Sequence, residues 1–279
     1  MFHFWVKKIT LMKKITMECG MKGIAISGLR KTLALPNIAA PIYRKLQDIL
    51  RELCRDQRSR RIIAVIFVIN LSFIAAHCFI QIALYFVLIE EFILHLRLNS
   101  WRFRLDRDGS VAEWFNYLQA TICVVLLLGV FRTTRQPLYA AWALIFLVVV
   151  VDDSLTIHER AASYVASTFG IPAVSYLRPQ DLGELLFWAT IGSVLVGILW
   201  WSFARSGRSA RDAGGVLALA FAALIFFAIG IDMIHMALSQ QGTGLYAVLA
   251  VLEDGGEMLS IGLASALALL LYRHPAIAG

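Results

Sequence analysis

The residues that could do chemistry are nine ionisable side chains that interrupt or end long apolar runs. They fall in the segments VVVVDDSLTIHER, IGIDMIHM and AVLEDGGEMLS, and they are Asp152, Asp153, His158, Glu159, Asp232, His235, Glu253, Asp254 and Glu257. A charged side chain in hydrocarbon costs at least about 2.5 kcal/mol, so these groups need partners. The simplest partners are one another, with a metal cation or shared protons between them.

This mixture of imidazole and carboxylate favours a transition-metal site. Neutral histidine with several carboxylates suits Zn, Fe or Mn, and Asp232 with His235 has the i, i+3 spacing used in dinuclear carboxylate bundles. That motif occurs only once here, so the sequence predicts a mononuclear or dinuclear site without naming the metal. The predicted ligands are Asp152, His158, Asp232, His235 and Glu253.

A metal in this position predicts an enzyme. A bound divalent ion lowers the pKa of water toward neutrality, which would allow hydrolysis of an ester or amide bond in a lipid, and a redox-active ion would support an oxidoreductase. Glu159 and Glu257 are the carboxylates that remain to carry protons, so we predict them as catalytic residues.

Two other classes of function stay open. Carboxylates and histidines inside a bundle also mark proton or cation pathways, and Gly255 with Gly256 could loosen the helix that carries Glu253 and Glu257. The acids gather at one face rather than along a path, which favours a site over a conduit, and for these glycines we favour close helix packing over a hinge. A non-catalytic accessory subunit would instead use the acids in ion pairs with Arg160 or Arg178.

The elements that must position these residues are membrane-spanning helices. Hydrophobic residues make up 59% of the 279-residue chain, charged residues only 16%, and the mean hydropathy is +0.72, which predicts an all-α, polytopic membrane bundle. Six apolar runs have spanning length: 62–88, 117–131, 137–151, 185–203, 216–238 and 245–271. The second and third runs are short and joined by FRTTRQP, so we expect a helical hairpin.

The chain divides into a basic arm, 1–61, a transmembrane bundle, 62–273, and a short tail, 274–279. The arm holds fourteen of the twenty-six Lys and Arg against four acids. We expect it to meet anionic lipid headgroups rather than nucleic acid, with an amphipathic helix in IYRKLQDILRELCRDQRSRR. We then expect both termini to be cytoplasmic, in a bacterial inner membrane. This topology places the arginine-rich loop HLRLNSWRFRLDRDG on the outer side, against the positive-inside rule.

Counting depth brings the three charged segments to one layer. About twenty residues from each cytoplasmic boundary, the outer boundary falls near Ile157, His235 and Leu252. On ideal helices Asp152 and Glu159 share a face, as do Glu253 and Glu257. Asp153 and Asp254 point about 100° away from the neighbouring acids on their helices, so we expect them to support the site from behind.

Other signals in the chain are weak. The four cysteines form no CxxC, and no P-loop, dinucleotide fingerprint or haem-binding CxxCH is present, so we expect neither a nucleotide nor a haem cofactor. His77 is expected to be a core histidine. The segment 162–183 is either a lid over the outer mouth or a simple connection.

Overall fold

The structure is a computed structural model that describes residues 39–86, 101–174, 177–239 and 245–279. Throughout this part the chain is helical, and six helices are long and apolar enough to cross a membrane. The predicted all-α class and the count of six helices of spanning length are therefore confirmed, and they support a multi-pass membrane protein. The basic arm up to residue 38 and the arginine at 97 lie outside the described residues.

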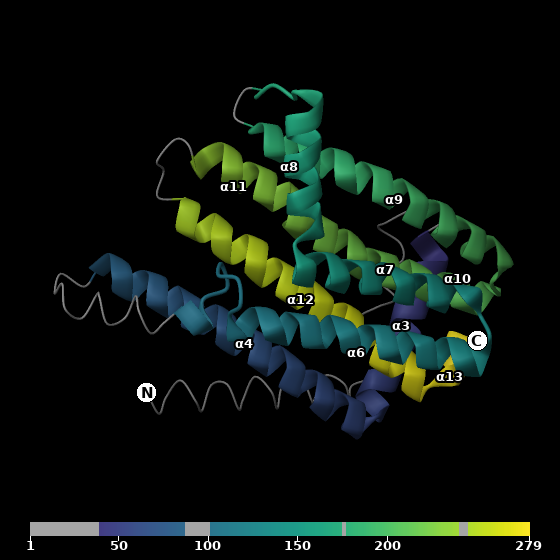
Figure 1. The fold of residues 1–279 in the computed structure, drawn as a ribbon. Coiled ribbons are helices and arrows are strands. Elements are labelled where there is room, and N and C mark those ends of the chain that lie inside the picture. The colour runs from purple at the N-terminus through teal and green to yellow at the C-terminus, as the bar shows by residue number, and fades with distance from the viewer. Residues whose placement is uncertain (1–38, 87–100, 175–176, 240–244) are drawn as a thin grey trace.

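The six long helices run alternately between two ends of the bundle (Figure 1). We call the end that carries the C-terminus the base, and the opposite end the far end. The helices are α4 (Gln57–Phe86), α6 (Val111–Thr134), α7 (Pro137–Leu155), α9 (Pro179–Arg205), α10 (Arg208–Ile225) continued by η2 (Phe226–Ile231) and α11 (Asp232–Ser239), and α12 (Tyr246–Arg273).

Four shorter elements complete the described fold: α3 (Ala39–Arg55), the 3₁₀ turn η1 (Trp101–Phe103), α8 (Ile157–Phe169) and α13 (Pro275–Ala278). α12 is the central helix, and 72% of its most apolar stretch is buried. α9 lies at one edge of the bundle beside α7 and α8, with only 6% of its most apolar stretch buried (Figure 1). This contrast between a buried centre and an open edge shapes the candidate site.

Local sequence signals place the helix ends. Ser110 caps α6 by accepting a hydrogen bond from the Glu113 backbone N–H (3.1 Å), and Pro137 opens α7 at the first turn, where a missing N–H is tolerated. α6 and α7 pack against each other, as the short FRTTRQP connection predicted. The four middle spans are longer than the predicted apolar runs because polar residues continue each helix past its apolar part.

The glycines of α12 serve close packing. A Cβ at Gly256 would lie 2.3 Å from the Phe227 ring of η2, and one at Gly255 would lie 3.3 Å from Ile74 of α4. α12 is continuous through both positions. This agrees with the expectation of packing rather than a hinge.

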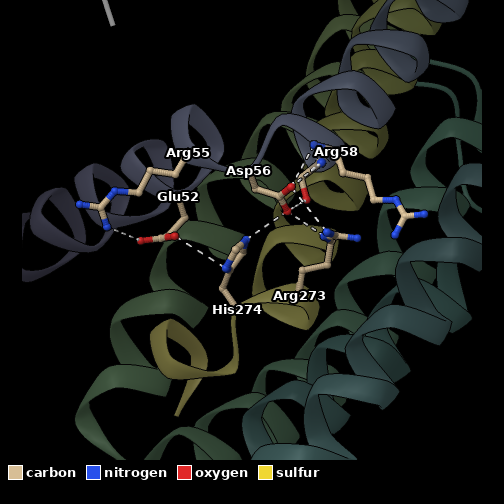
Figure 2. A network of polar contacts seen from close by, with 7 residues as sticks. Glu52, Arg55, Asp56, Arg58, Arg273 and His274 are labelled. Carbon is tan, nitrogen blue, oxygen red and sulfur yellow. Dashed lines mark hydrogen bonds and ion pairs between the residues drawn. The ribbon is translucent and has the colours of Figure 1, made fainter. Parts of the chain in front are cut away.

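The base is held by a network of paired charges between the two ends of the described chain (Figure 2). Asp56, between α3 and α4, accepts hydrogen bonds from the backbone of Arg58 (3.0 Å) and the hydroxyl of Ser59 (2.6 Å). The same carboxylate binds Arg273 Nε at 2.8 Å and lies 3.3 Å from His274 Nε2. The predicted amphipathic helix is thus α3, which ends at Arg55 and is tied to the end of α12.

Candidate metal and acid site at the far end

The first wall of the site is made by a sharp break between α7 and α8. Thr156 has φ 47° and ψ 44°, a left-handed conformation that is strained for a β-branched residue. Strain of this kind persists where the surroundings enforce it, and it is common at functional sites. The break turns the chain so that His158 folds back over Asp152.

Asp152 holds His158 in place by two hydrogen bonds. Its Oδ1 accepts the His158 backbone N–H at 2.9 Å, and its Oδ2 lies 2.6 Å from His158 Nδ1. The ring hydrogen bond raises the pKa of His158, and burial opposes part of that rise. With Nδ1 engaged, the Nε2 atom is the position on this ring that a ligand can use, which is the usual arrangement of a metal-bound histidine and its supporting carboxylate.

A second histidine and carboxylate pair forms the opposite wall. His235 of α11 lies with Nδ1 2.6 Å from Glu253 Oε2 of α12. α11 follows directly after η2, a stretch of π-helix that ends at Ile231, just before Asp232. A π-helical insertion shifts the phase of everything beyond it and is frequent at functional sites, so it contributes to turning Asp232 and His235 toward α12.

Between these walls lies a polar cavity of about 630 Å³. Its lining contains two histidines, the guanidinium groups of Arg104 and Arg107, and nine carboxyl groups: Asp106, Asp108, Glu113, Asp153, Glu159, Asp232, Glu253, Asp254 and Glu257. The carboxyl groups of this cavity therefore outnumber its arginines by nine to two. Such a cavity suits a bound cation or shared protons.

The structure brings most of the predicted site residues to this cavity. Four of the five predicted ligands line it, as do both predicted proton carriers: His158, His235, Asp232, Glu253, Glu159 and Glu257. The exception is Asp152, which is only 2% exposed and lies behind His158. Glu253 likewise supports His235, although it also reaches the cavity wall.

The expected division between lining and supporting acids differs from the structure. Asp153 and Asp254 both line the cavity, whereas the phase argument put them behind it. The expected positions hold only for one unbroken helix from Asp152 to Glu159. The chain breaks at Thr156, so these two residues lie on different helices and do not share a face. Asp254 reaches the cavity on the side facing the loop before α6, which helical phase alone could not show.

Among the described residues, one group of three has ligand atoms close enough to share a metal ion. Asp152, Asp153 and His158 each offer an atom within 4.8 Å of the others. The five predicted ligands therefore do not form a single coordination sphere in this structure. The group that could hold a metal lies at the α7–α8 break, with Asp232, His235 and Glu253 across the cavity.

The loop before α6 supplies cavity residues that the sequence reading did not include. Arg104 binds Asp106 through two hydrogen bonds, of 2.8 and 2.5 Å. His77 is fully buried on α4, and its Nδ1 accepts the Leu105 backbone N–H at 3.0 Å, so it anchors this loop as a core histidine. The sequence signal that could have identified this loop is the alternation of Arg and Asp directly before the Ser110 cap.

The first turns of α6 add a tyrosine and a glutamate to the same wall. Tyr117 donates its hydroxyl to the Glu113 side chain and to the Asp153 backbone carbonyl, the latter at 3.2 Å. Glu113 also accepts the Gly109 backbone N–H. These contacts join the loop, α6 and the end of α7 into one cavity wall.

An apolar groove of about 900 Å³ opens from the same cavity along α9. Six residues line both hollows: Asp153, His158, Glu159, Asp232, Glu253 and Glu257. Arg178, Gln180 and Glu184 at the start of α9 add to this polar end. The rest of the groove is lined by apolar side chains of α7, α9 and α10, including Trp142, Leu195 and Phe221. A polar cavity thus continues directly into an apolar groove at the open edge of the bundle.

Arg178, a predicted ion-pair partner for the acids, pairs elsewhere. Its guanidinium donates to Asp181 at 2.7 and 3.0 Å, and Asp181 is 1% exposed. Arg160 is exposed on α8. The charge of Arg178 is therefore matched by a tenth acid, and the excess in the cavity remains.

No curated protein and no solved structure matches this chain significantly. One family model matches residues 105–272, which is more than half of the chain and begins at the loop that closes the cavity. The match contains every predicted site residue and excludes α3 and α4. The chain therefore belongs to the family described as Domain of unknown function (DUF8692).

Proposed function

We propose that this protein is a metal-dependent membrane enzyme, a hydrolase or oxidoreductase, that acts on a lipid or another membrane-soluble substrate. The observation that carries the proposal is a cavity with two carboxylate-supported histidines that opens into an apolar groove. Such a cavity can hold a polar reacting group while the groove holds an apolar tail. An ordinary solvent-facing cation site would have no use for the groove.

In this proposal each residue has a definite task. His158 and Asp153 bind a Zn, Fe or Mn ion and Asp152 fixes the His158 ring, while Asp232 and His235 line the opposite wall. When bound, the metal would activate water or a redox reaction. Glu159 and Glu257 reach both the cavity and the groove, so they are placed to exchange protons with a substrate at the boundary.

The proposal also assigns an orientation. Both termini face the cytoplasm of a bacterial inner membrane, the base lies at the inner surface with the N-terminal arm on anionic headgroups, and the cavity opens at the outer leaflet. The arginines of the described connections 132–136 and 205–211, together with Arg273, lie at the base and support this orientation.

The metal content of purified protein tests the proposal. Wild-type protein should carry a stoichiometric transition metal, and His158→Ala should lose it. The matched control is His274→Ala, because His274 lies in the ion pairs of the base (Figure 2). Wild-type protein without stoichiometric metal, after purification free of chelators, would show that the enzyme proposal in this form is wrong.

One observation favours cation or proton transport as a second candidate. Beyond Glu257 the polar line continues toward the base, where buried Asn70 donates to Gln119 at 3.0 Å and to the Met258 carbonyl at 3.4 Å. A conducting path would need polar groups at this depth. Transport predicts cation-dependent uptake into proteoliposomes that Glu257→Gln abolishes, whereas the enzyme proposal predicts no net flux.

A further inference from the structure

The apolar groove identifies the kind of molecule that the cavity would receive. α9 packs on α7 and α8 but stands away from α10 and η2, and the groove lies between them. Away from its polar end its walls are apolar, with Trp142 and Val149 on one side, Leu195 and Leu199 on another, and Phe221 on the third. α9 is the least buried of the six candidate spans, so the groove faces the lipid side.

The groove has the length of one leaflet. From Asp153 at its polar end to Trp142 at its apolar end, α7 advances eleven residues, or about 16 Å at 1.5 Å per residue. Half of a typical hydrocarbon core is about 15 Å thick. A single acyl chain can therefore lie along the groove with its head group at the level of the carboxylates.

The charge at the polar end selects the head group. The six residues shared by groove and cavity are five carboxylic acids and one histidine. Arg178 is the one arginine on the groove wall, and its charge is already matched by Asp181. An anionic head group would meet a cluster of acids here, whereas an ammonium group would meet an excess of acceptors and would favour the ionised form of these acids.

We propose that the groove is the lateral entrance and chain-binding site for a lipid with a positively charged amine head group, whose ammonium binds the carboxylates shared with the cavity. This inference rests on the proposed function for its meaning, since it names the substrate class of the same site. It makes a claim of its own, however, because binding of an amphiphile requires no reaction and no metal.

Binding of matched single-chain amphiphiles to detergent-purified, full-length protein tests this inference. Dodecylamine and dodecanoic acid share a chain length and carry opposite charges at pH 7. We expect dodecylamine to bind about tenfold or more tightly than dodecanoic acid, since one favourable ionic contact is worth about 1–4 kcal/mol near a protein surface. Equal or tighter binding of the acid would overturn the proposal.

Two substitutions on opposite walls locate the binding. Ala222→Trp on α10 and Ala189→Trp on α9 each fill the groove from an exposed position, and each should lower dodecylamine affinity about tenfold. Ala64→Trp on α4 is the matched control, since Ala64 is exposed outside the groove. Unchanged affinity in both folded groove variants would overturn the proposal. A second copy of the chain covering the groove would also overturn it; in that case the protein would be a dimer, and both variants would dissociate the dimer without weakening amine binding.

The metal content of the same samples separates the two failures. Amine preference in protein that never carries metal would leave this inference standing and remove the enzyme proposal. Metal-loaded protein that binds amine and acid equally would remove this inference and leave the enzyme proposal standing. The groove variants should keep their metal, because both positions line the groove and neither lines the polar cavity.

Discussion

The polar groups of this protein form two regions that differ in whether their acids are paired with cations of the chain. At the base, Asp56 is bound by Arg273, His274 and the start of α4, and Lys45 is satisfied by Ser209 and the Ile277 carbonyl, each at 2.7 Å (Figure 2). In the far-end cavity, nine carboxyl groups share two arginines and two histidines. Both regions are rich in acids, but only the base neutralises them with the chain's own cations.

This difference separates a structural network from a candidate site. Matched ion pairs stabilise a fold without needing anything else, whereas an uncompensated cluster costs stability until a ligand or proton arrives. Proteins keep such costs mainly where function requires them. The following substitutions test whether the two regions differ in this sense.

The largest expected effect is on metal affinity. Asp152→Asn removes the carboxylate that fixes His158, and loss of such a supporting group typically weakens metal binding about 10- to 100-fold. Asp56→Asn, at the base, should leave affinity unchanged. Competition with a chelating indicator measures both. If Asp152→Asn binds metal as tightly as wild type, the Asp152–His158 pair is only a structural contact.

Close packing beside the cavity should be the next most sensitive feature. Gly256→Ala places a methyl group 2.3 Å from the Phe227 ring, so we expect a loss of about 1–3 kcal/mol in the free energy of unfolding. Gly197→Ala on the open edge meets nothing within 4 Å and should be neutral or slightly stabilising. Denaturant unfolding in detergent compares the pair. Equal losses would mean that the cavity wall is no more tightly packed than α9.

Neutralising an acid should change stability in opposite directions in the two regions. In metal-free protein, Asp254→Asn removes one half-buried acid from a cluster of acids and should raise the melting temperature by a few degrees, about 2–4 °C per kcal/mol. Asp56→Asn removes a matched charge and should lower the melting temperature. Two changes of the same sign would contradict the proposed contrast.

The smallest expected effect is the acid sensitivity of the base. Hydrogen bonds from Ser59 and Arg273 hold the pKa of Asp56 well below its usual range. A lowered folded-state pKa contributes stability above the unfolded-state value, near 4, and this contribution is lost as the pH falls through the folded-state pKa. The difference in melting temperature between wild type and Asp56→Asn should therefore shrink below about pH 4. A difference that stays constant down to pH 2 would disprove the linkage.

Much of the architecture could be predicted because apolar length is a local property. Six runs of spanning length gave six helices, and FRTTRQP gave the α6–α7 hairpin. Depth counting also placed Glu159, Asp232 and Glu257 at one level, because an α-helix rises by a constant amount per residue. Helical phase was less reliable, since the Thr156 break and the π-helix before Asp232 both reset it.

The sequence by itself determined that this chain is an apolar helical bundle and that its misplaced acids and histidines share one layer. Both follow from composition and from the fixed rise of a helix. Only the tertiary structure decided which acids support histidines, which line the cavity, and that the cavity continues into a groove along α9. These features depend on which helices are neighbours and on the spacing between them. That spacing is set by the packing of side chains that are far apart in the sequence.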